Sequence, residues 1–500
     1  MNKQKTFGQV FTPSWIVNEI LNLVGYFDEG ILDKYVLEPA SGDGVFLAEI
    51  VERYINVSMT NDIKPNAIKL NLEKYIYGVE IDFSEYQKSI QLLDNLINTK
   101  FGSEITVQWN IHNKDTFDFY KDFPNFFDYI VGNPPYVRIH NISNETRNIL
   151  SKNFKFASGT IDLYLPFLEM SLAMMNESAR LGFITPNSLL HNSSYKAFRS
   201  YLKRLKNLEI LIDFKANKIF KGFSTYTSIT ILNNNRKEDF FTYKELIGSK
   251  ILEVNKVEYK LLNDNDWSFS NEADQKFILG LSTGKNSRVK DFFDVQYGFA
   301  TLRDKIFIAN AELYNDSLVT FNNHLVEKNI LKKIVKGSRF KGTIDENNLI
   351  LFPYFKSGDK YIPFQEDNLA TNYPNAYKYL LANKDELESR DLDKGAMWYE
   401  FGRSQGVQSM HKEKIVLSPL INGKVTFYRI PADVLVYSGI FIVKNKSYSN
   451  WALIEQVLRS EDFFRYIRIT GKDFSGGYKS ITTKQIKEFL ICASNPQSIF

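Results

Sequence analysis

The sequence predicts an α/β fold, in which a doubly wound, mostly parallel sheet carries helices on both faces and is followed by a mixed α+β domain. Three observations lead to this prediction. Short apolar runs suited to buried strands alternate with helical patterns through the first half of the chain. A glycine loop joins the first strand to a helix. Polar residues close successive strands at their carboxyl ends, which is where an open α/β sheet binds its ligand.

Length and composition indicate a globular protein of more than one domain. A chain of 500 residues is too long for one ordinary core, and 44% hydrophobic with 24% charged residues is typical of a globular protein. The single cysteine excludes an intrachain disulfide and a cysteine-rich zinc site, and the five histidines show no ligand spacing, so we expect no metal. The net charge of +4 is compatible with a nucleic-acid partner without establishing one. Because we find neither an apolar leader nor a bilayer-length apolar run, we expect a cytoplasmic protein without a membrane partner.

The first expected helix runs from about residue 15 to 24 and follows a polar loop. Thr12 or Ser14 can cap this helix, and Pro13 fits its first turn. Taken alone, the pattern favours ordinary capping over a binding role.

The first strand, at about 35–38, leads through a glycine loop into the next helix. Gly42 and Gly44 let the backbone approach a ligand closely, and the following helix offers free N–H groups. The loop lacks the lysine of a phosphate-binding loop. Glu38, at the end of the strand, suits a ligand with a positive group better than a pyrophosphate.

The next two strands also end in acidic residues. A polar helical insertion, about 53–74, precedes a second strand at 75–82, where Glu80 is placed to bind ribose hydroxyls. A third strand, at about 105–111, is followed by Asp115.

The fourth strand, 127–131, stops at a turn that contains two prolines. Asn133 and Pro134 each precede a proline, so both favour extended geometry and the turn is stiff. The amide oxygen of Asn133 and the carbonyl of Pro134 can accept both hydrogens of an exocyclic amino group, and Tyr136 can stack on the base that carries it. Two such acceptors would stabilise the positive charge that develops when this nitrogen attacks an electrophilic carbon. A plain proline-rich turn remains the alternative for this motif alone.

The remaining elements complete the sheet. We expect helices at about 160–175 and 194–206, and strands at 180–187, 208–214 and 226–232. In the loop between the last two strands, an exposed Phe220 flanked by lysines would suit a stacking surface. The polar run 233–239 closes the sheet, and we place the domain boundary between residues 245 and 246.

The second domain, 246–500, interleaves asparagine, lysine and aromatic residues and has weak periodicity. The stretch 398–406 mixes aromatics with Arg403 and Gln405, side chains that can read purine edges. A second cluster, the basic stretch within 322–342, comprises Lys328, Lys332, Lys333, Lys336, Arg339 and Lys341. For each of these two clusters, a solvated face is as good an interpretation as a binding patch.

Taken in order, these motifs resemble those of the gamma class of adenine-specific (N6) DNA methyltransferases of type II restriction-modification systems. The residues that carry the resemblance are Gln9-Val10-Phe11-Thr12-Pro13, Leu37-Glu38-Pro39-Ala40, Gly78-Val79-Glu80-Ile81-Asp82, Asp115 and Asn133-Pro134-Pro135-Tyr136. The resemblance covers the first half well and the second half loosely, around 398–405 and 474–483. The insertion at 53–74 and the form of the glycine loop depart from the pattern, but neither touches the turn.

The resemblance implies a Rossmann-like class I methyltransferase domain followed by a target-recognition domain. It implies transfer of a methyl group from S-adenosylmethionine to the N6 amino group of an adenine flipped out of double-stranded DNA, which protects DNA in a restriction-modification system. It also allows a separately encoded restriction endonuclease as a partner, and we expect a monomer. The implied roles are catalysis for Asn133, Pro134 and Tyr136, cofactor binding for Thr12, Glu38, Ala40, Gly42, Glu80, Ile81 and Asp115, and DNA binding for Phe220, Lys332, Lys333, Arg339, Arg403 and Gln405.

Other functions are compatible with parts of the pattern. The same turn occurs in methyltransferases of protein glutamine and of ribosomal RNA, but those chains are much shorter and leave half of this one unexplained. A second alternative is a DNA-binding subunit with no activity of its own. The turn 133–136 argues against it, because such a subunit would not need this motif. A methyltransferase fused to a restriction nuclease would use the E-x-K sequence Glu258-Tyr259-Lys260, for which a surface charge pair is the simpler interpretation.

Overall fold

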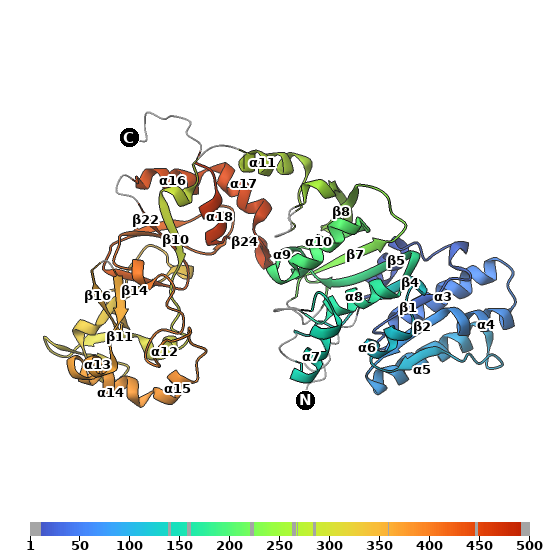
Figure 1. Cartoon of the computed structure of the whole chain (residues 1–500), viewed down its shortest axis with the longest axis horizontal. Helices are drawn as coiled ribbons and strands as arrows, with labels where there is room; N and C mark the ends of the chain where they lie inside the picture. Colours follow the sequence, from blue (N-terminus) through green and yellow to red (C-terminus); the bar gives the residue numbers. More distant parts are fainter. Residues whose placement is uncertain are drawn as a thin grey trace. The chain divides into compact units, whose positions relative to one another are not determined.

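The computed structural model describes residues 12–138, 142–157, 162–220, 225–262, 267, 269–283, 287–358, 360–445 and 449–491. The chain divides into two compact units, Met1–Gln275 and Lys276–Phe500 (Figure 1).

The first unit is built on a nine-stranded sheet with the order β3-β2-β1-β4-β5-β7-β6-β8-β9. Strands β1 to β5 are parallel, β7 is antiparallel to both of its neighbours, and β8 is parallel to β6 and antiparallel to β9. The strands are β1 (Val36–Glu38), β2 (Ile76–Glu80), β3 (Asn110–Asn113), β4 (Phe127–Gly132), β5 (Met175–Pro186), β6 (Leu208–Asp213), β7 (Thr227–Asn233), β8 (Phe240–Ile247) and β9 (Lys250–Glu258).

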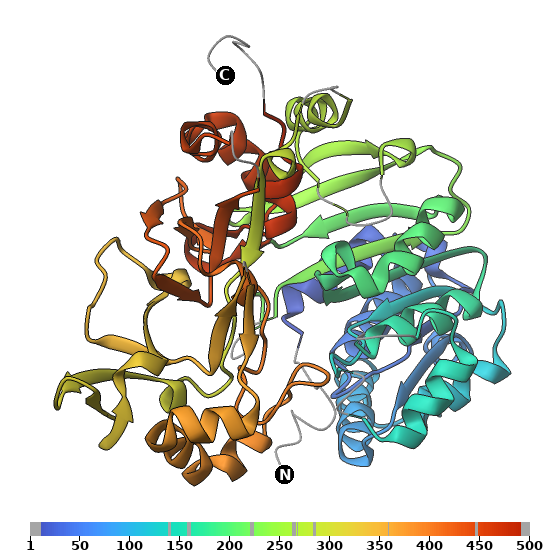
Figure 2. The same cartoon turned by 60° about the vertical axis from the view of Figure 1, so that its left-hand side comes forward.

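Helices cover both faces of this sheet (Figure 1 and Figure 2), as the sequence predicts. Neighbouring residues of a strand enter different cores: Leu37 packs with α8 and α10, whereas Val36 packs with α2, α3 and α5. The helices of the first unit are α2 (Ser14–Leu23), α3 (Val45–Thr60), α4 (Pro65–Tyr75), α5 (Phe83–Phe101), α6 (Thr116–Phe119), α7 (Asn144–Asn153), α8 (Tyr164–Met174), α9 (Ser188–His191) and α10 (Lys196–Leu205), and α11 (Glu272–Thr283) crosses the boundary.

The strand order places the topological switch point between β1 and β4. From β1 the sheet continues outward through β2 and β3, and from β4 it continues outward through β5. A crevice opens at the carboxyl ends of the strands where the order reverses in this way. Glu38 ends β1, and Asn133 follows β4, so both lie at the switch point.

The prediction that the sheet closes at 233–239 is wrong, and the boundary lies after Gln275 rather than at 245. The polar run is only the connection from β7 to β8, and β8 and β9 extend the sheet by two strands. These strands belong to the first unit because Tyr243, Val257 and Trp267 are buried in the same core as β4 and β5.

The second unit is a mixed α+β structure with two cores. One core joins a six-stranded sheet, β13-β12-β11-β15-β14-β21, to α13 and α14, and the other joins a four-stranded sheet, β10-β22-β18-β20, to α16, α17 and α18. The strands are β10 (Phe293–Tyr297), β11 (Ile308–Leu313), β12 (Leu318–Phe321), β13 (His324–Glu327), β14 (Leu331–Lys336), β15 (Asn348–Leu351), β16 (Tyr354–Ser357), β17 (Lys360–Pro363), β18 (Lys414–Leu417), β19 (Leu420–Ile421), β20 (Phe427–Ile430), β21 (Val434–Tyr437), β22 (Ile440–Lys444), β23 (Asp473–Phe474) and β24 (Tyr478–Ser480). The helices are α12 (Asp304–Phe307), α13 (Glu366–Asn372), α14 (Pro374–Ala382), α15 (Lys384–Glu388), α16 (Trp451–Arg459), α17 (Glu461–Thr470) and α18 (Thr483–Glu488).

Within the described part of the chain, no helix combines the length and apolar character needed to cross a bilayer. The same residues contain no group of three or more His, Cys, Asp or Glu side chains arranged to hold a metal ion.

Candidate functional site

The glycine loop after β1 is held close to β2. The N–H of Ser41 donates to the carbonyl of Val79 at 2.9 Å, and the N–H of Gly44 donates to the carbonyl of Ser41 at 2.9 Å. Gly44 has a φ of +87°, and a Cβ there would lie 2.7 Å from the Cβ of Ser89, so no other residue fits. Gly42 has a φ of +52° and would place a Cβ in open space. The loop is therefore rigid, with room in front of Gly42.

Two buried carboxylates flank this loop. Glu80, 7% exposed, accepts from the N–H of Gly42 at 2.7 Å and from the N–H of Asp82 at 2.7 Å. Glu38, 2% exposed, accepts from the N–H of Leu47, in the first turn of α3, at 3.1 Å. Both side chains therefore have fixed positions at the carboxyl ends of neighbouring strands.

The electrostatics around these two carboxylates favour a positively charged ligand. Burial, followed by the nearby charge of Asp43, raises the pKa of Glu38 well above its usual value, and Glu80 contributes further. Burial also raises the pKa of Glu80, although N–H groups of Asp82 and Gly42 oppose this rise. A ligand cation would relieve the repulsion between these carboxylates, and their remaining lone pairs can accept from hydroxyl groups.

The other residues predicted to bind a cofactor lie around the same edge. Ala40 is half-buried and lies two residues after the end of β1, and Ile81 is 55% exposed directly after β2. Asp115 follows β3 and caps α6, where it accepts from the N–H of Phe117 at 2.9 Å. Sequence reasoning missed Thr116, whose hydroxyl donates to the carbonyl of Pro39 at 2.6 Å and so ties this loop to the end of β1.

The turn after β4 is anchored by its two polar side chains. Asn133 donates through Nδ2 to Oγ1 of Thr12 at 3.1 Å. Tyr136 donates through its hydroxyl to the carbonyl of Ile184 in β5 at 3.0 Å, and burial raises its pKa well above the usual value. Thr12 does not cap α2, because the capping position is Pro13, which makes no side-chain hydrogen bond. The structure thus connects Thr12 to the turn across 121 residues of sequence.

Phe220 lies beside Tyr136, but it is buried rather than exposed as predicted. The two ring centroids are 6.2 Å apart with an angle of 69° between the planes, and Phe220 is only 3% exposed. Its ring belongs to the core that also contains side chains of α2 and α3. Phe220 and Tyr136 are therefore in an edge-to-face contact.

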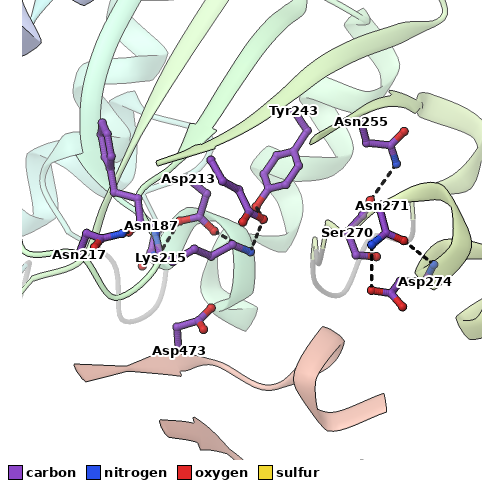
Figure 3. Close-up of polar contacts among 12 residues, drawn as sticks. Asn187, Asp213, Lys215, Asn217, Tyr243, Asn255, Ser270, Asn271, Asp274 and Asp473 are labelled. Atoms are coloured by element: carbon purple, nitrogen blue, oxygen red, sulfur yellow. Dashed lines mark hydrogen bonds and ion pairs between the residues drawn. The ribbon is translucent and has the colours of Figure 1, made fainter. Parts of the chain in front are cut away.

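A polar network that sequence reasoning missed lies at the carboxyl ends of β5, β6 and β8 (Figure 3). Asn187 donates through Nδ2 to Oδ1 of Asp213 at 3.3 Å. The Lys215 ammonium lies 3.4 Å from Oδ2 of Asp213 and 3.1 Å from Oε1 of Glu245. Tyr243 donates through its hydroxyl to Oε1 of Glu245 at 2.7 Å. An acidic residue at the end of the predicted sixth strand was the available signal, since Asp213 follows the rule that identified Glu38 and Glu80.

The basic residues predicted to bind DNA in the second unit lie on or near β14. Lys332 and Lys333 are half-buried in this strand, and Arg339 follows it in a short 3-10 helix, Gly337–Arg339. The ammonium of Lys333 lies 2.6 Å from Oε2 of Glu346.

Arg403 and Gln405 also make contacts within the second unit. Arg403 forms an ion pair with Asp391, Nη2 to Oδ2 at 2.6 Å, and Gln405 donates to the carbonyl of Gly298 at 3.5 Å. The aromatics of this stretch belong to the core: Phe401 is fully buried and stacks on Phe299 with centroids 4.4 Å apart.

The E-x-K sequence at the end of β9 forms a local ion pair. The ammonium of Lys260 lies 2.5 Å from Oε2 of Glu258, with 75% and 48% of the two side chains exposed. Tyr259 between them is buried and donates to the carbonyl of Leu208 at 2.7 Å. This geometry is that of a surface charge pair.

Sequence comparisons relate the chain to restriction-modification proteins. Residues 50–220 match the family described as the Eco57I restriction-modification methylase. The chain is 25% identical to the type II restriction enzyme and methyltransferase RM.Eco57I of Escherichia coli, over 95% of this chain and 56% of that protein. It is 28% identical to the type II methyltransferase M.BstVI of Geobacillus stearothermophilus, over 49% of this chain and 46% of that protein. The chain therefore spans about half the length of these two relatives.

A third relative matches from end to end, and solved structures share the fold. The chain is 23% identical to the type II methyltransferase M.HincII of Haemophilus influenzae, over 95% of this chain and 96% of that protein. The type IIL restriction-modification enzyme MmeI, solved in complex with DNA, superposes with a TM-score of 0.61 at 14% identity, over 97% of this chain and 65% of that chain. The chain is thus a relative of the type II restriction-modification methyltransferases, and its residues 50–220 are similar to the Eco57I restriction-modification methylase family.

Proposed function

We propose that this chain is a site-specific DNA methyltransferase that transfers a methyl group from S-adenosylmethionine to the N6 amino group of an adenine flipped out of double-stranded DNA. The observation that carries the proposal is the turn 133–136, which follows β4 at the switch point of the sheet, beside the acidic crevice of β1 and β2. An acceptor turn and a crevice for a cationic cofactor are the two parts that methylation of an amino group needs.

The crevice suits S-adenosylmethionine. This molecule carries a positive sulfonium, a positive amino group and ribose hydroxyls, and it would supply an electrophilic methyl group. Glu80 would accept from the ribose hydroxyls, Glu38 would face positive charge, and the open space before Gly42 would admit the ligand. Ala40, Ile81 and Asp115 lie along the same edge and would line the rest of the site.

The turn would prepare the target nitrogen for attack. The side-chain oxygen of Asn133 and the carbonyl of Pro134 would accept the two N–H groups of the amino group, which draws the nitrogen away from conjugation with the ring. The same oxygens would stabilise the positive charge that develops on it. The hydrogen bond from Nδ2 of Asn133 to Thr12 supports this role, because it leaves the oxygen as the end of the amide that can accept.

Tyr136 and Phe220 would stack on the target base. Rotation of the base out of the duplex costs about a few kcal/mol, which stacking partly offsets. Because the two rings touch edge to face at 6.2 Å, the aromatic ring of Phe220 must turn before a base can lie against Tyr136.

We infer that double-stranded DNA is the partner and that the second unit selects the site. The name of RM.Eco57I joins a restriction enzyme to a methyltransferase, so a nuclease in the same system is the natural partner activity. Glu258 and Lys260 form a surface ion pair rather than part of a nuclease site. For the residues described here, this favours methylation without DNA cleavage. We propose a cytoplasmic monomer that acts beside a separately encoded endonuclease.

Sequencing that reports modified bases, on DNA from cells that express the chain, tests the proposal. We expect N6-methyladenine at one short sequence, and its loss with Asn133→Ala. In the purified variant, methyl transfer should fall by about two orders of magnitude, as when one charge-stabilising group is removed, while calorimetry shows unchanged S-adenosylmethionine affinity. Near wild-type turnover of Asn133→Ala would refute the two-acceptor mechanism, and modification of another base would refute the proposed substrate.

A further inference from the structure

The polar network of β5, β6 and β8 holds one cation between two carboxylates. Asp213 and Glu245 are paired residues of neighbouring strands, and the Lys215 ammonium reaches both. The exposed fractions of the Asp213, Glu245 and Lys215 side chains are 3%, 22% and 25%. In such partly buried surroundings two neighbouring carboxylates repel each other unless a cation lies between them. Lys215 therefore offsets the repulsion between the two carboxylates at this edge of the sheet.

The backbone of Lys215 is part of the same device. The residue has a φ of +52°, a left-handed conformation that costs energy for a side chain of this kind. Its N–H donates to Oδ1 of Asp213 at 2.9 Å, so the carboxylate that binds the ammonium also holds the backbone. The turn that leaves β6 is thus fixed at two points by one side chain (Figure 3).

The loop that carries Phe220 begins with this turn. The N–H of Phe214 donates to the carbonyl of Thr227 at 3.1 Å, and Asn217 donates through its backbone N–H and its side chain to the carbonyl of Phe214, each at 2.9 Å. From this fixed start the chain reaches Phe220, whose ring contacts Tyr136. The direction in which the loop leaves β6 decides where that ring lies.

We propose that Lys215, held by Asp213 and Glu245, is a positioning residue: it fixes the loop that keeps Phe220 beside Tyr136, from where the ring turns to meet the target base. This rests on the proposed function, because the base enters only if the chain methylates a flipped nucleotide. Lys215 touches neither base nor cofactor in this role and acts through the loop 214–220.

Lys215→Asn tests the proposal, because asparagine tolerates the left-handed conformation while it removes the ammonium. The measurement is methyl transfer to genomic DNA from a strain without DNA methylases. We expect kcat/KM for DNA to fall about tenfold or more, as misplacement of a substrate-contacting group does, and S-adenosylmethionine affinity by calorimetry to stay within about twofold. Lys215→Arg should restore most of the rate.

Lys206 offers a matched control in the same unit. It is also a lysine with a left-handed conformation, at a φ of +55°, and its ammonium also pairs with one carboxylate, that of Asp239, at the exposed end of α10. Lys206→Asn should leave kcat/KM within about twofold of wild type, because its loop carries no residue of the proposed site.

A double-mutant cycle separates positioning from a purely structural role. If Lys215 acts through Phe220, then Lys215→Asn should have no further effect on kcat/KM in a Phe220→Ala background. Hydrogen exchange of the amides at 215–220 should accelerate in Lys215→Asn and not in Lys206→Asn. Equal rate losses in both backgrounds, or unchanged exchange in the loop, would overturn the proposal. Absence of methyl transfer in wild type would instead refute the proposed function, and the exchange measurement would still test the loop.

Discussion

The two ends of the Asn133 amide have opposite hydrogen-bonding chemistry, and the NH2 end is bound to Thr12. The oxygen accepts, whereas the NH2 group donates and would repel the amino group of a target base. Nδ2 donates to the Thr12 hydroxyl at 3.1 Å, so in this orientation the oxygen is the end of the amide that can accept from a base. We therefore expect Thr12 to hold the Asn133 side chain in place, in addition to the cofactor role that the sequence suggests.

Thr12→Val, which keeps the shape and removes the hydroxyl, should lower kcat by roughly two- to tenfold, as loss of one neutral hydrogen bond of about 0.5–1.5 kcal/mol predicts. Single-turnover methyl transfer measures the rate, and Thr12→Ser is the control that should retain it. If Thr12→Val instead weakens S-adenosylmethionine binding and leaves the rate of the saturated enzyme unchanged, Thr12 serves the cofactor alone.

Burial of Glu38 affects the stability of the folded protein in a pH-dependent way. Burial and the charge of Asp43 raise its pKa in the folded state, so folding favours the protonated carboxyl. The stabilising contribution of this group is complete below its unfolded pKa of about 4.3 and is lost as the pH rises through the higher folded value. At neutral pH the titration of this carboxyl therefore lowers the stability of the fold.

Glu38→Gln should consequently raise the free energy of unfolding by on the order of 1 kcal/mol at pH about 7 and change it little at pH about 4. The amide oxygen can still accept from the N–H of Leu47, so the packing is preserved. Guanidinium unfolding at the two pH values measures the effect, and calorimetry should show weaker S-adenosylmethionine binding. A variant that is less stable at neutral pH would contradict the assignment of strain to this carboxylate.

At the scale of elements, the sequence predicted the strands that carry the site and missed those that close the unit. The strands β1, β2 and β4 are short apolar runs with a polar residue at the carboxyl end, a pattern that local chemistry dictates. β8 and β9 form a hairpin beyond the polar run 233–239, and nothing local distinguishes them from a new domain.

Contacts between residues that are far apart in the sequence could not be predicted from local patterns either. The bond between Thr12 and Asn133 joins residues 121 apart, and Lys215 reaches Glu245 on another strand. The burial of Phe220 likewise depends on the core of α2 and α3 rather than on its lysine neighbours.

The position of the boundary predicts how fragments behave. A fragment ending at residue 245 would cut β8 and remove β9 together with the buried side chains of Val257, Tyr259, Trp267 and Phe269, each of which stabilises the fold by about 1.5–3 kcal/mol. We expect that fragment to aggregate, whereas residues 1–275 should unfold cooperatively and bind S-adenosylmethionine. Circular dichroism during thermal unfolding compares the two. A soluble, cooperative 1–245 fragment would show that β9 is dispensable.

At the scale of the whole molecule, the two units divide different kinds of chemistry. The first unit holds the turn and the acidic residues at the ends of β1 and β2, which under the proposed function would act in the same way on any adenine. The second unit contributes basic side chains whose charges are partly neutralised: Lys333 pairs with Glu346, and Arg403 pairs with Asp391. A DNA phosphate would have to displace these carboxylates from the basic side chains, which reduces the binding free energy that each contact contributes. Lys332, in the same strand as Lys333, is therefore the better candidate for a phosphate contact.

Two substitutions should separate positioning on DNA from reading of its sequence. Lys332→Ala should weaken binding to every DNA sequence alike and reduce the slope of log affinity against log salt by about one, because one phosphate contact is lost. Lys333→Ala should have a smaller effect, since Glu346 already pairs with its ammonium.

Arg403→Ala should lower the free energy of binding by roughly 1–3 kcal/mol on the methylated site and change it little on random DNA, because a base contact carries sequence information. Titrations of fluorescent duplexes at several salt concentrations, once the site is known from sequencing, measure all three. Equal losses on both duplexes for Arg403→Ala would make Arg403 a backbone contact and move sequence reading elsewhere in the second unit.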